Sequence, residues 1–547
     1  MKMKKILSII LVGLTLGMST GCNDFLNPQQ IDLIYNDVFW TTQTDAQVGL
    51  NGVYALYRGL MADCSNWYQR ADATTGLWKR GWTGGSSQYL YTEGVYGDIQ
   101  NNSKMWGSSD LEGMAHWGDF YKVISQANMV IDKVKDMPES AFATGQKNRI
   151  LGEAYFLRGL VYFNILRIWG NAPYISDMIE SSSQVIDKDL VPITIPRTDD
   201  VVIGQNILSD VNLAVEYLDY AKYGSTNWGI FADKGAALAL QGHVNMWMNF
   251  LAKRERMTKE RQKYLDDAIK ALETYEKEAG RSYVNYSVDG AVKAMYKGLS
   301  TEAVFELCVD PDNNESYRAD YYGVQAITCK FIPRDGLEDH DRSMSVNFIP
   351  FAQKAKIYPE YDFETQTGDI RPHLFFAAWD STLDEAINDT GGANNRSLVT
   401  WMTKFSEMTD DSYADWDEYN AYFAVCNIPV FRHTDVMLLL AEAYCKDKKY
   451  AKAQAIVDEI RARAGLNPYS GVDADLLNEV LQQRTAELIG EGHLYFDYVR
   501  NESFPNEHLM KPLKYKEEGY YWPVAGDILR TNPDIQQTPY WNGKTKW

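Results

Sequence analysis

The strongest constraint on the fold is the spacing of apolar residues between Asn148 and Trp169. Apolar side chains recur there in steps of three and four, which places them on one face of an α-helix. They are Ile150, Ala154, Leu157, Val161, Ile165 and Ile168. Aromatic residues widen this stripe, so we expect the helix to be covered on two sides. The segment from Trp117 to Val134 has the same spacing, and the two segments predict an antiparallel helix pair joined by a turn over Met137–Gly145.

Further segments show the same helical period, and most of them come in neighbouring pairs. They are Val201–Tyr220, Lys234–Leu251, Tyr264–Gly280, Asp435–Lys446, Tyr450–Ala464 and Asp475–Ile489. Small residues between Gly235 and Gly242 predict a close helix contact, and Lys253–Lys263 predicts a solvated, charged turn. Residues 441–460 resemble one tetratricopeptide hairpin, but the pairs are irregularly spaced. The sequence therefore predicts an all-α fold of tetratricopeptide-like helix pairs.

The N-terminus has the features of an export signal. Lys2, Lys4 and Lys5 precede an apolar run over Ile6–Leu16, and small residues follow. The apolar run is too short to span a bilayer. Because Cys22 stands directly after these small residues, we expect residues 1–21 to be a lipoprotein signal peptide and Cys22 to carry the lipid. Ordinary secretion with an incidental cysteine is the alternative.

Charge and motifs exclude several classes of function. A formal net charge of −20 opposes binding to nucleic acid or to anionic membrane surfaces. The cysteines and histidines show no metal-ligand spacing, and the usual hydrolase, dinucleotide and phosphate-loop motifs do not occur. Asp310–Glu315 only faintly resembles a calcium loop. We therefore expect no catalytic residue, no metal and no cofactor, although a glycosidase carboxylate pair is defined in space and has no sequence signature.

Two regions between the helical segments are rich in aromatic residues and glycines. Residues 64–107 hold four of the chain's 15 tryptophans and seven glycines, and residues 281–430 predict loops with a few short strands. Exposed aromatic rings on loops suit sugar rings, whose C–H faces stack on them. The alternative is that these rings form the core of a loop-rich region. The candidate ligand-binding residues are Trp67, Trp78, Trp82, Tyr89, Trp106, Tyr321 and Tyr322.

Several short motifs, in order along the chain, resemble the RagB/SusD family of outer-membrane nutrient-binding lipoproteins. The N-terminal motifs are Cys22 to Leu26, then Trp117, Tyr121, Ile124, Ala127 and Asn128, then Glu153 to Arg158 and Gly170 to Pro173. The later motifs are Asp369 to Arg371, Arg432 to Asp435 with Leu438 and Ala441 to Ala443, Ile460 to Gly465, Arg484, Glu487, Glu491 to His493, Phe496 and Asp497, and Asn532 and Pro533 ahead of Pro539 and Tyr540. We expect these residues to be mostly scaffold, with Arg432 and Asp435 either pairing or bracing a neighbour.

The resemblance implies a tetratricopeptide-like all-α scaffold with loop-rich, variable elements that hold the ligand. It implies a single domain over residues 22–547, made of an N-terminal helical part (22–280), a variable part (281–430) and a C-terminal helical part with a closing segment (431–547). It also implies a lipid-anchored location on the cell surface at the outer membrane, with a SusC-like TonB-dependent transporter as partner. The expected function is capture of oligosaccharide for uptake. Peptide binding on the same scaffold and a surface glycoside hydrolase are the alternatives.

Overall fold

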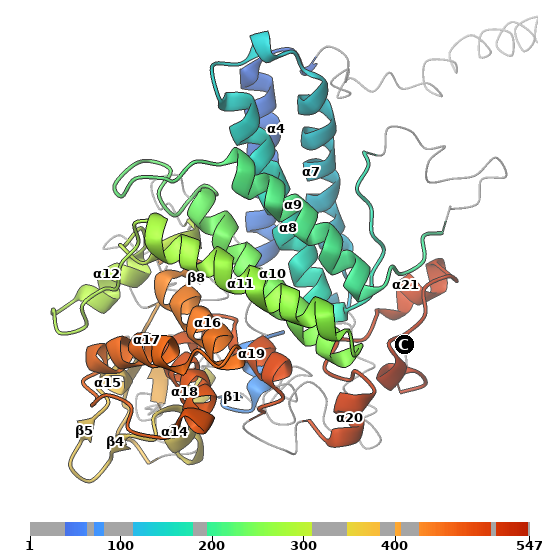
Figure 1. Cartoon of the computed structure of the whole chain (residues 1–547). Helices are drawn as coiled ribbons and strands as arrows, with labels where there is room; N and C mark the ends of the chain where they lie inside the picture. The colour runs from blue at the N-terminus through green and yellow to red at the C-terminus, as the bar shows by residue number, and fades with distance from the viewer. Residues whose placement is uncertain are drawn as a thin grey trace, which may run out of the picture.

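The computed structural model describes residues 39–62, 70–80, 113–178, 194–308, 347–382, 400–405, 426–504 and 510–544. Helices dominate these residues (Figure 1). The long helices are α4 (Gln43–Ala62), α7 (Gly118–Asp136), α8 (Gln146–Trp169), α9 (Asp200–Tyr217), α10 (Lys234–Arg254), α11 (Thr258–Glu278), α16 (His433–Lys446), α17 (Tyr450–Arg463) and α18 (Leu476–Leu488). The short helices are α12 (Ala291–Lys297), α14 (Phe351–Ile357), α15 (Arg371–Phe375), α19 (Leu494–Asn501), α20 (Pro512–Lys516) and α21 (Gly526–Thr531). The predicted all-α class is confirmed.

Successive helices pack as antiparallel hairpins. Helices α7 and α8 form the predicted pair, and the pairs α8–α9, α10–α11 and α16–α17 follow the same pattern (Figure 1). Every residue of α8 from Ile150 to Leu166 is buried, because α4, α7 and α9 all pack against this helix. The expectation that α8 is covered on more than one side is therefore confirmed.

The contact between α10 and α11 is as close as its small residues predicted. A Cβ placed on Gly242 would lie 2.3 Å from a methyl carbon of Leu272, so only glycine fits there. The predicted charged turn over Lys253–Lys263 is wrong, however. Helix α10 continues to Arg254 and α11 already begins at Thr258. The first residues of α11 are polar because they are exposed to solvent, and not because they form a turn.

The strands are few and short, as expected. Strand β2 (Ala303–Leu307) pairs antiparallel with β8 (Ile428–Arg432), and β4 (Tyr361–Asp362) pairs with β5 (Thr367–Gly368). A four-stranded antiparallel sheet has the order β1-β3-β7-β6. Its strands are β1 (Lys79–Arg80), β3 (Asn347–Ile349), β7 (Thr400–Met402) and β6 (Phe376–Ala377).

One connected cluster of buried apolar side chains extends from Ala46 on α4 to Trp541 near the C-terminus. The thiol of Cys445 is free, so the Cys426–Cys445 disulfide that the sequence would allow is not formed. Of the described helices, none combines the length and the apolar composition that a bilayer span requires.

Candidate functional site

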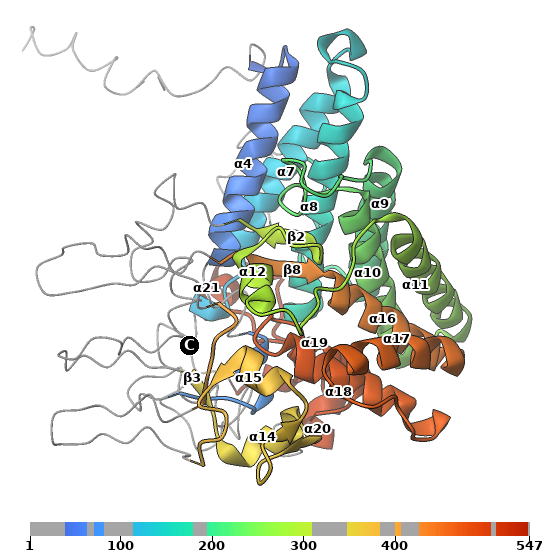
Figure 2. The same cartoon turned by 90° about the vertical axis from the view of Figure 1, so that its left-hand side faces the viewer.

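The four-stranded sheet brings together the ends of the segments that carry the predicted aromatic ligand contacts. Strand β1 ends at Arg80, directly before residues 81–112, and β3 begins directly after residues 309–346. In the register of this sheet, Lys79 lies opposite Phe348 and Phe348 lies opposite Trp401. Two regions that are more than 200 residues apart in the sequence therefore meet at one sheet, beside α14 and α15 (Figure 2).

Trp78 is the one candidate aromatic residue within the described residues, and it belongs to the core. Its side chain is 1 % exposed, and its indole packs against the ring of Phe376 with 6.4 Å between the centroids. A Cβ on Gly490 would lie 4.0 Å from this indole, which places the indole against the loop between α18 and α19. Trp78 thus supports the sheet from below. The other candidates and the lipid attachment residue lie outside the described residues: Trp67, Trp82, Tyr89, Trp106, Tyr321, Tyr322 and Cys22.

Asp72, in the short 3₁₀-helix η2 (Asp72–Thr75), fastens this region to the C-terminal helices. Its buried carboxylate accepts hydrogen bonds from the backbone N–H groups of Gly490, Gly492 and Leu494, at 2.5, 3.2 and 3.1 Å. Burial raises the pKa of Asp72 to about 7, against the effect of these three donors. The sequence gave no signal for this anchor, because its partners lie more than 400 residues further along the chain.

An aromatic cluster borders the same sheet. The ring of Phe351 at the start of α14 is 37 % exposed and packs edge-on against Phe363, with 5.3 Å between the centroids. Beneath them, the buried ammonium group of Lys354 donates to the backbone carbonyls of Trp379 and Ser381. Phe351 is a partly exposed ring beside the sheet, and sequence reasoning missed it because one phenylalanine in a short helix has no distinguishing pattern.

Tyr361 and its polar partners stand at the rim of this cluster. The Tyr361 hydroxyl lies 2.8 Å from Nε2 of His373 and donates to the Asp380 carboxylate at 2.5 Å. His373 and Asp380 are partly exposed. The rim thus combines aromatic rings with hydrogen-bonding groups, which is the combination that sugar recognition uses.

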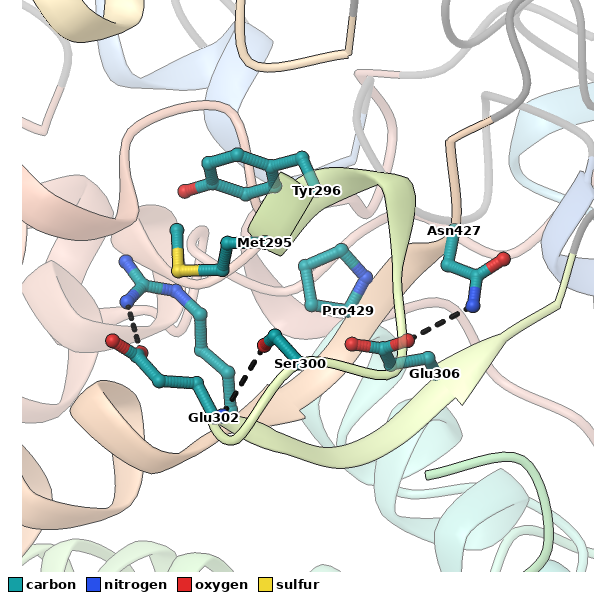
Figure 3. A pocket seen from close by; sticks show the side chains of 8 residues that line it. Met295, Tyr296, Ser300, Glu302, Glu306, Asn427 and Pro429 are labelled. Atoms are coloured by element: carbon teal, nitrogen blue, oxygen red, sulfur yellow. Dashed lines mark hydrogen bonds and ion pairs between the residues drawn. The ribbon is translucent and has the colours of Figure 1, made fainter. Parts of the chain in front are cut away.

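Beside this sheet lies a pocket between β2 and β8 that contains two carboxylates (Figure 3). Its volume is about 10 Å³, which is about what a single water molecule needs. Glu302 and Glu306 stand at its opposite ends, where Arg432 pairs with Glu302 and Asn427 donates to Glu306 (Figure 3). Because a sugar ring does not fit into this space, the pair has no geometry for glycoside hydrolysis.

The environments of these two carboxylates are opposite. Burial acts to raise the pKa of Glu302, but Arg463 and Arg432 outweigh it and lower this pKa to about 2. Burial raises the pKa of Glu306 to about 7, because its partners are an amide and a backbone N–H and not a cation. Such a split is used by some hydrolases, but in a pocket of this size it reflects structural pairing.

The family motifs form two buried ionic networks. We call the first the Arg432 network. Its members pair as four cations with four carboxylates: Arg371, Lys404, Arg432 and Arg463 with Glu302, Asp369, Glu487 and Glu491. All eight side chains are at most 7 % exposed. A network in which every charge is matched is a structural brace, since breaking one pair would leave a buried charge uncompensated.

The second network surrounds Asp435. It pairs three cations with three carboxylates: Lys446, Arg484 and Arg500 with Asp435, Glu442 and Asp497. His243 also lies 2.8 Å from the Asp435 carboxylate, and burial lowers the pKa of this histidine, so it is neutral. Arg432 and Asp435 do not pair with each other. Each braces other elements, which is one of the two roles expected for them.

Within the described residues, no group of three or more His, Cys, Asp or Glu side chains is arranged to hold a metal ion. The segment Asp310–Glu315, with its faint likeness to a calcium loop, lies outside those residues.

Two family models match this chain. One is described as "SusD family" and matches residues 381–511. The other is described as "Starch-binding associating with outer membrane" and matches residues 33–245. Between them the two models account for more than half of the chain, on both sides of the variable part.

Curated relatives match the chain over nearly its whole length. SusD-like protein P38 of Formosa agariphila is 24 % identical over 568 residues, covering 98 % of this chain and 100 % of the relative. SusD-like protein P2 of the same organism is 22 % identical over 565 residues, covering 98 % and 99 %.

Solved structures share the fold. A SusD homolog from Bacteroides thetaiotaomicron superimposes with a TM-score of 0.73 at 22 % identity, covering 92 % of this chain and 99 % of the other. A laminarin-binding SusD-like protein superimposes with a TM-score of 0.65 at 21 % identity, covering 91 % and 99 %. With family models on both sides of the variable part and full-length SusD-like relatives, this chain belongs to the SusD/RagB family.

Proposed function

We propose that this protein is a cell-surface glycan-binding lipoprotein that captures oligosaccharide at the outer membrane and delivers it to a SusC-like TonB-dependent transporter. The observation that carries the proposal is the four-stranded sheet. It brings together the ends of residues 81–112 and 309–346, which contain five of the predicted aromatic contacts. The laminarin-binding neighbour supports a glycan as the ligand class.

The proposed contacts are the aromatic candidates other than Trp78, together with Phe351. Stacking on aromatic rings is the interaction that a neutral sugar offers, and polar side chains at the rim would bind its hydroxyl groups. Trp78 is left out because its indole is buried under the sheet.

Affinity electrophoresis against a panel of polysaccharides tests the proposal. We expect the wild type to be retarded by at least one glycan, and a variant with Trp67, Trp82 and Trp106 all changed to alanine to lose this retardation. Tyr223→Ala is the matched control, because Tyr223 is 61 % exposed and comes from the loop between α9 and α10. The site assignment fails if the wild type binds no glycan, or if the triple variant binds as well as the control.

Salt dependence separates a glycan from a peptide ligand. Binding of a neutral sugar by stacking should change little between low and high salt, whereas an acidic protein that selects basic peptides would lose affinity. Release of reducing ends from the bound polysaccharide would instead indicate a hydrolase. We propose a protein without catalysis, because the carboxylates of the Arg432 network are paired.

The tether and the transporter are tested separately from the ligand site. Cys22→Ala should release the protein from the membrane fraction and leave glycan binding in vitro unchanged. A SusC-like barrel should copurify with the wild type from outer membranes. We propose residues 22–547 as a single SusD-like domain after the signal peptide, and the continuous apolar core from Ala46 to Trp541 supports this.

A further inference from the structure

Arg167 is a cation without a counter-ion in the interior, between α4, α8 and α19. Its guanidinium lies between the rings of Phe163 and Phe496, 4.3 and 4.4 Å from their centroids. Within the described part of the chain it forms no ion pair, whereas the neighbouring Asp435 network is balanced by its own three cations. Arg167 therefore adds one positive charge that nothing nearby neutralises. Burial lowers its pKa to about 10, which leaves it charged at neutral pH.

Three hydrogen-bond donors around this guanidinium have no acceptor among the described residues. They are Nε of Arg167, Nδ2 of Asn164 and the hydroxyl of Tyr57, and all three atoms are buried. Tyr57 is 1 % exposed and Asn164 is 6 % exposed. The three residues are neighbours: Arg167 donates to the Asn164 carbonyl oxygen at 2.6 Å, and both residues act on the pKa of Tyr57, which burial raises.

Leaving buried donors unpaired is unfavourable, and such groups normally have a partner. Arg197 shows how the same chain satisfies another arginine that has no carboxylate partner. Its guanidinium donates to the backbone carbonyls of Asn171, Gln536 and Trp169. Arg167 has only the one bond to Asn164, so its surroundings lack an acceptor and a negative charge at the same place.

We propose that Tyr57, Asn164 and Arg167 bind a small monovalent anion of halide size. Each of the three donors would direct one hydrogen bond to the anion, and the anion would neutralise the surplus guanidinium. A water molecule could accept two of these bonds but would leave the charge unmatched. The anion would tie α4 to α8 and so act on stability, apart from the glycan-binding face.

Crystals of the wild type grown in sodium bromide test the site directly. We expect an anomalous bromine peak within hydrogen-bond distance of Nε of Arg167, Nδ2 of Asn164 and Oη of Tyr57. The absence of this peak, or an ordered water in its place, would overturn the proposal.

A solution experiment tests the same site by thermal unfolding in sodium chloride and in sodium gluconate at equal ionic strength. A tenfold excess of halide over its dissociation constant should raise the unfolding midpoint by on the order of 1 °C in a chain of this length. Arg167→Met keeps the packing between the two rings and should abolish this difference. Tyr54→Phe, on the same helix, removes a hydroxyl that is bound to Glu153 and should keep it. A difference that persists in Arg167→Met contradicts the proposal.

Discussion

Replacing Glu306 with glutamine should make the protein more stable at alkaline pH than the wild type. The Glu306 oxygen that accepts from Leu299 N–H and from the Asn427 amide, both at 2.9 Å, becomes an amide oxygen that accepts the same two bonds. The substitution therefore keeps the geometry and removes a negative charge that has no cation beside it. The side chain is 5 % exposed, so water does not take the place of that missing cation.

The size of the effect follows from the pKa. The pKa of Glu306 is raised from 4.5 to about 7 in the folded protein, so between these values the unfolded chain loses its proton while the folded chain keeps it. The free energy of unfolding falls with rising pH wherever the folded state binds more protons. At 1.36 kcal/mol per pKa unit, the wild type loses about 3 kcal/mol as the pH rises from 4.5 through 7, and Glu306→Gln does not.

The assay is denaturant unfolding followed by tryptophan fluorescence at several pH values between 4.5 and 8. The quantity of interest is the difference in the free energy of unfolding between variant and wild type, in which the other titrating groups cancel. Glu302→Gln serves as the opposite control. Since the pKa of Glu302 is lowered to about 2, its ionic pairs stabilise the fold above pH 4.5 and lose their effect as the pH falls toward 2. If the Glu306→Gln difference stays flat from pH 4.5 to 8, the carboxyl is hydrated or paired and the reasoning is refuted.

Three further changes test the packing and the buried titration. Trp78→Ala should lower the free energy of unfolding by about 3–5 kcal/mol, and a loss below about 1 kcal/mol would show that the indole is not packed in the core. Gly242→Ala forces a Cβ against Leu272 and should cost about 1–3 kcal/mol, whereas Gly59→Ala, which meets nothing within 4 Å, should gain up to about 1 kcal/mol; chemical unfolding of both variants decides. Burial lowers the pKa of His433 to about 4, so folding stability is lost as the pH falls from 6.5 through 4, and His433→Gln should flatten this part of the stability profile; an unchanged slope would contradict the assignment.

The long helices could be predicted from the sequence because their apolar period is strong. Helices α7, α8 and α16 begin and end within two residues of the predicted bounds. Helix α4 was missed although Ala46, Leu50, Val53 and Tyr57 follow the helical period, since three glycines interrupt its sequence. The start of α11 was missed because a polar, exposed first turn has the composition of a loop.

The sheet could not be predicted, because strands of two or three residues have no measurable period. Its pairing also joins residues that are far apart, such as Lys79 and Phe348. The enrichment of aromatic residues in 64–107 identified a distinct region, but composition does not distinguish a ring that faces solvent from one that lies beneath a sheet. Trp78 is of the second kind, and only its contact with Phe376 shows this.

The loop between α18 and α19 explains how a scaffold motif can serve ligand binding without contacting a ligand. Strands of two or three residues are not stable alone, and this sheet is fastened at both sides to that loop. Asp72, close before β1, binds the backbone of Gly490, Gly492 and Leu494. Lys404, two residues after β7, pairs with Glu491 and donates to the Glu487 carbonyl.

The residues of this loop are among those that resembled the SusD/RagB family, and the Arg432 network fixes them from the other side. The loop therefore transmits the rigidity of the buried charges to the sheet from which the aromatic segments extend. A change in the loop should disturb ligand binding through the position of the sheet, while substitutions within the aromatic segments should alter binding and leave the scaffold intact. This division of roles accounts for a family whose helices share motifs while the segments between them are free to differ.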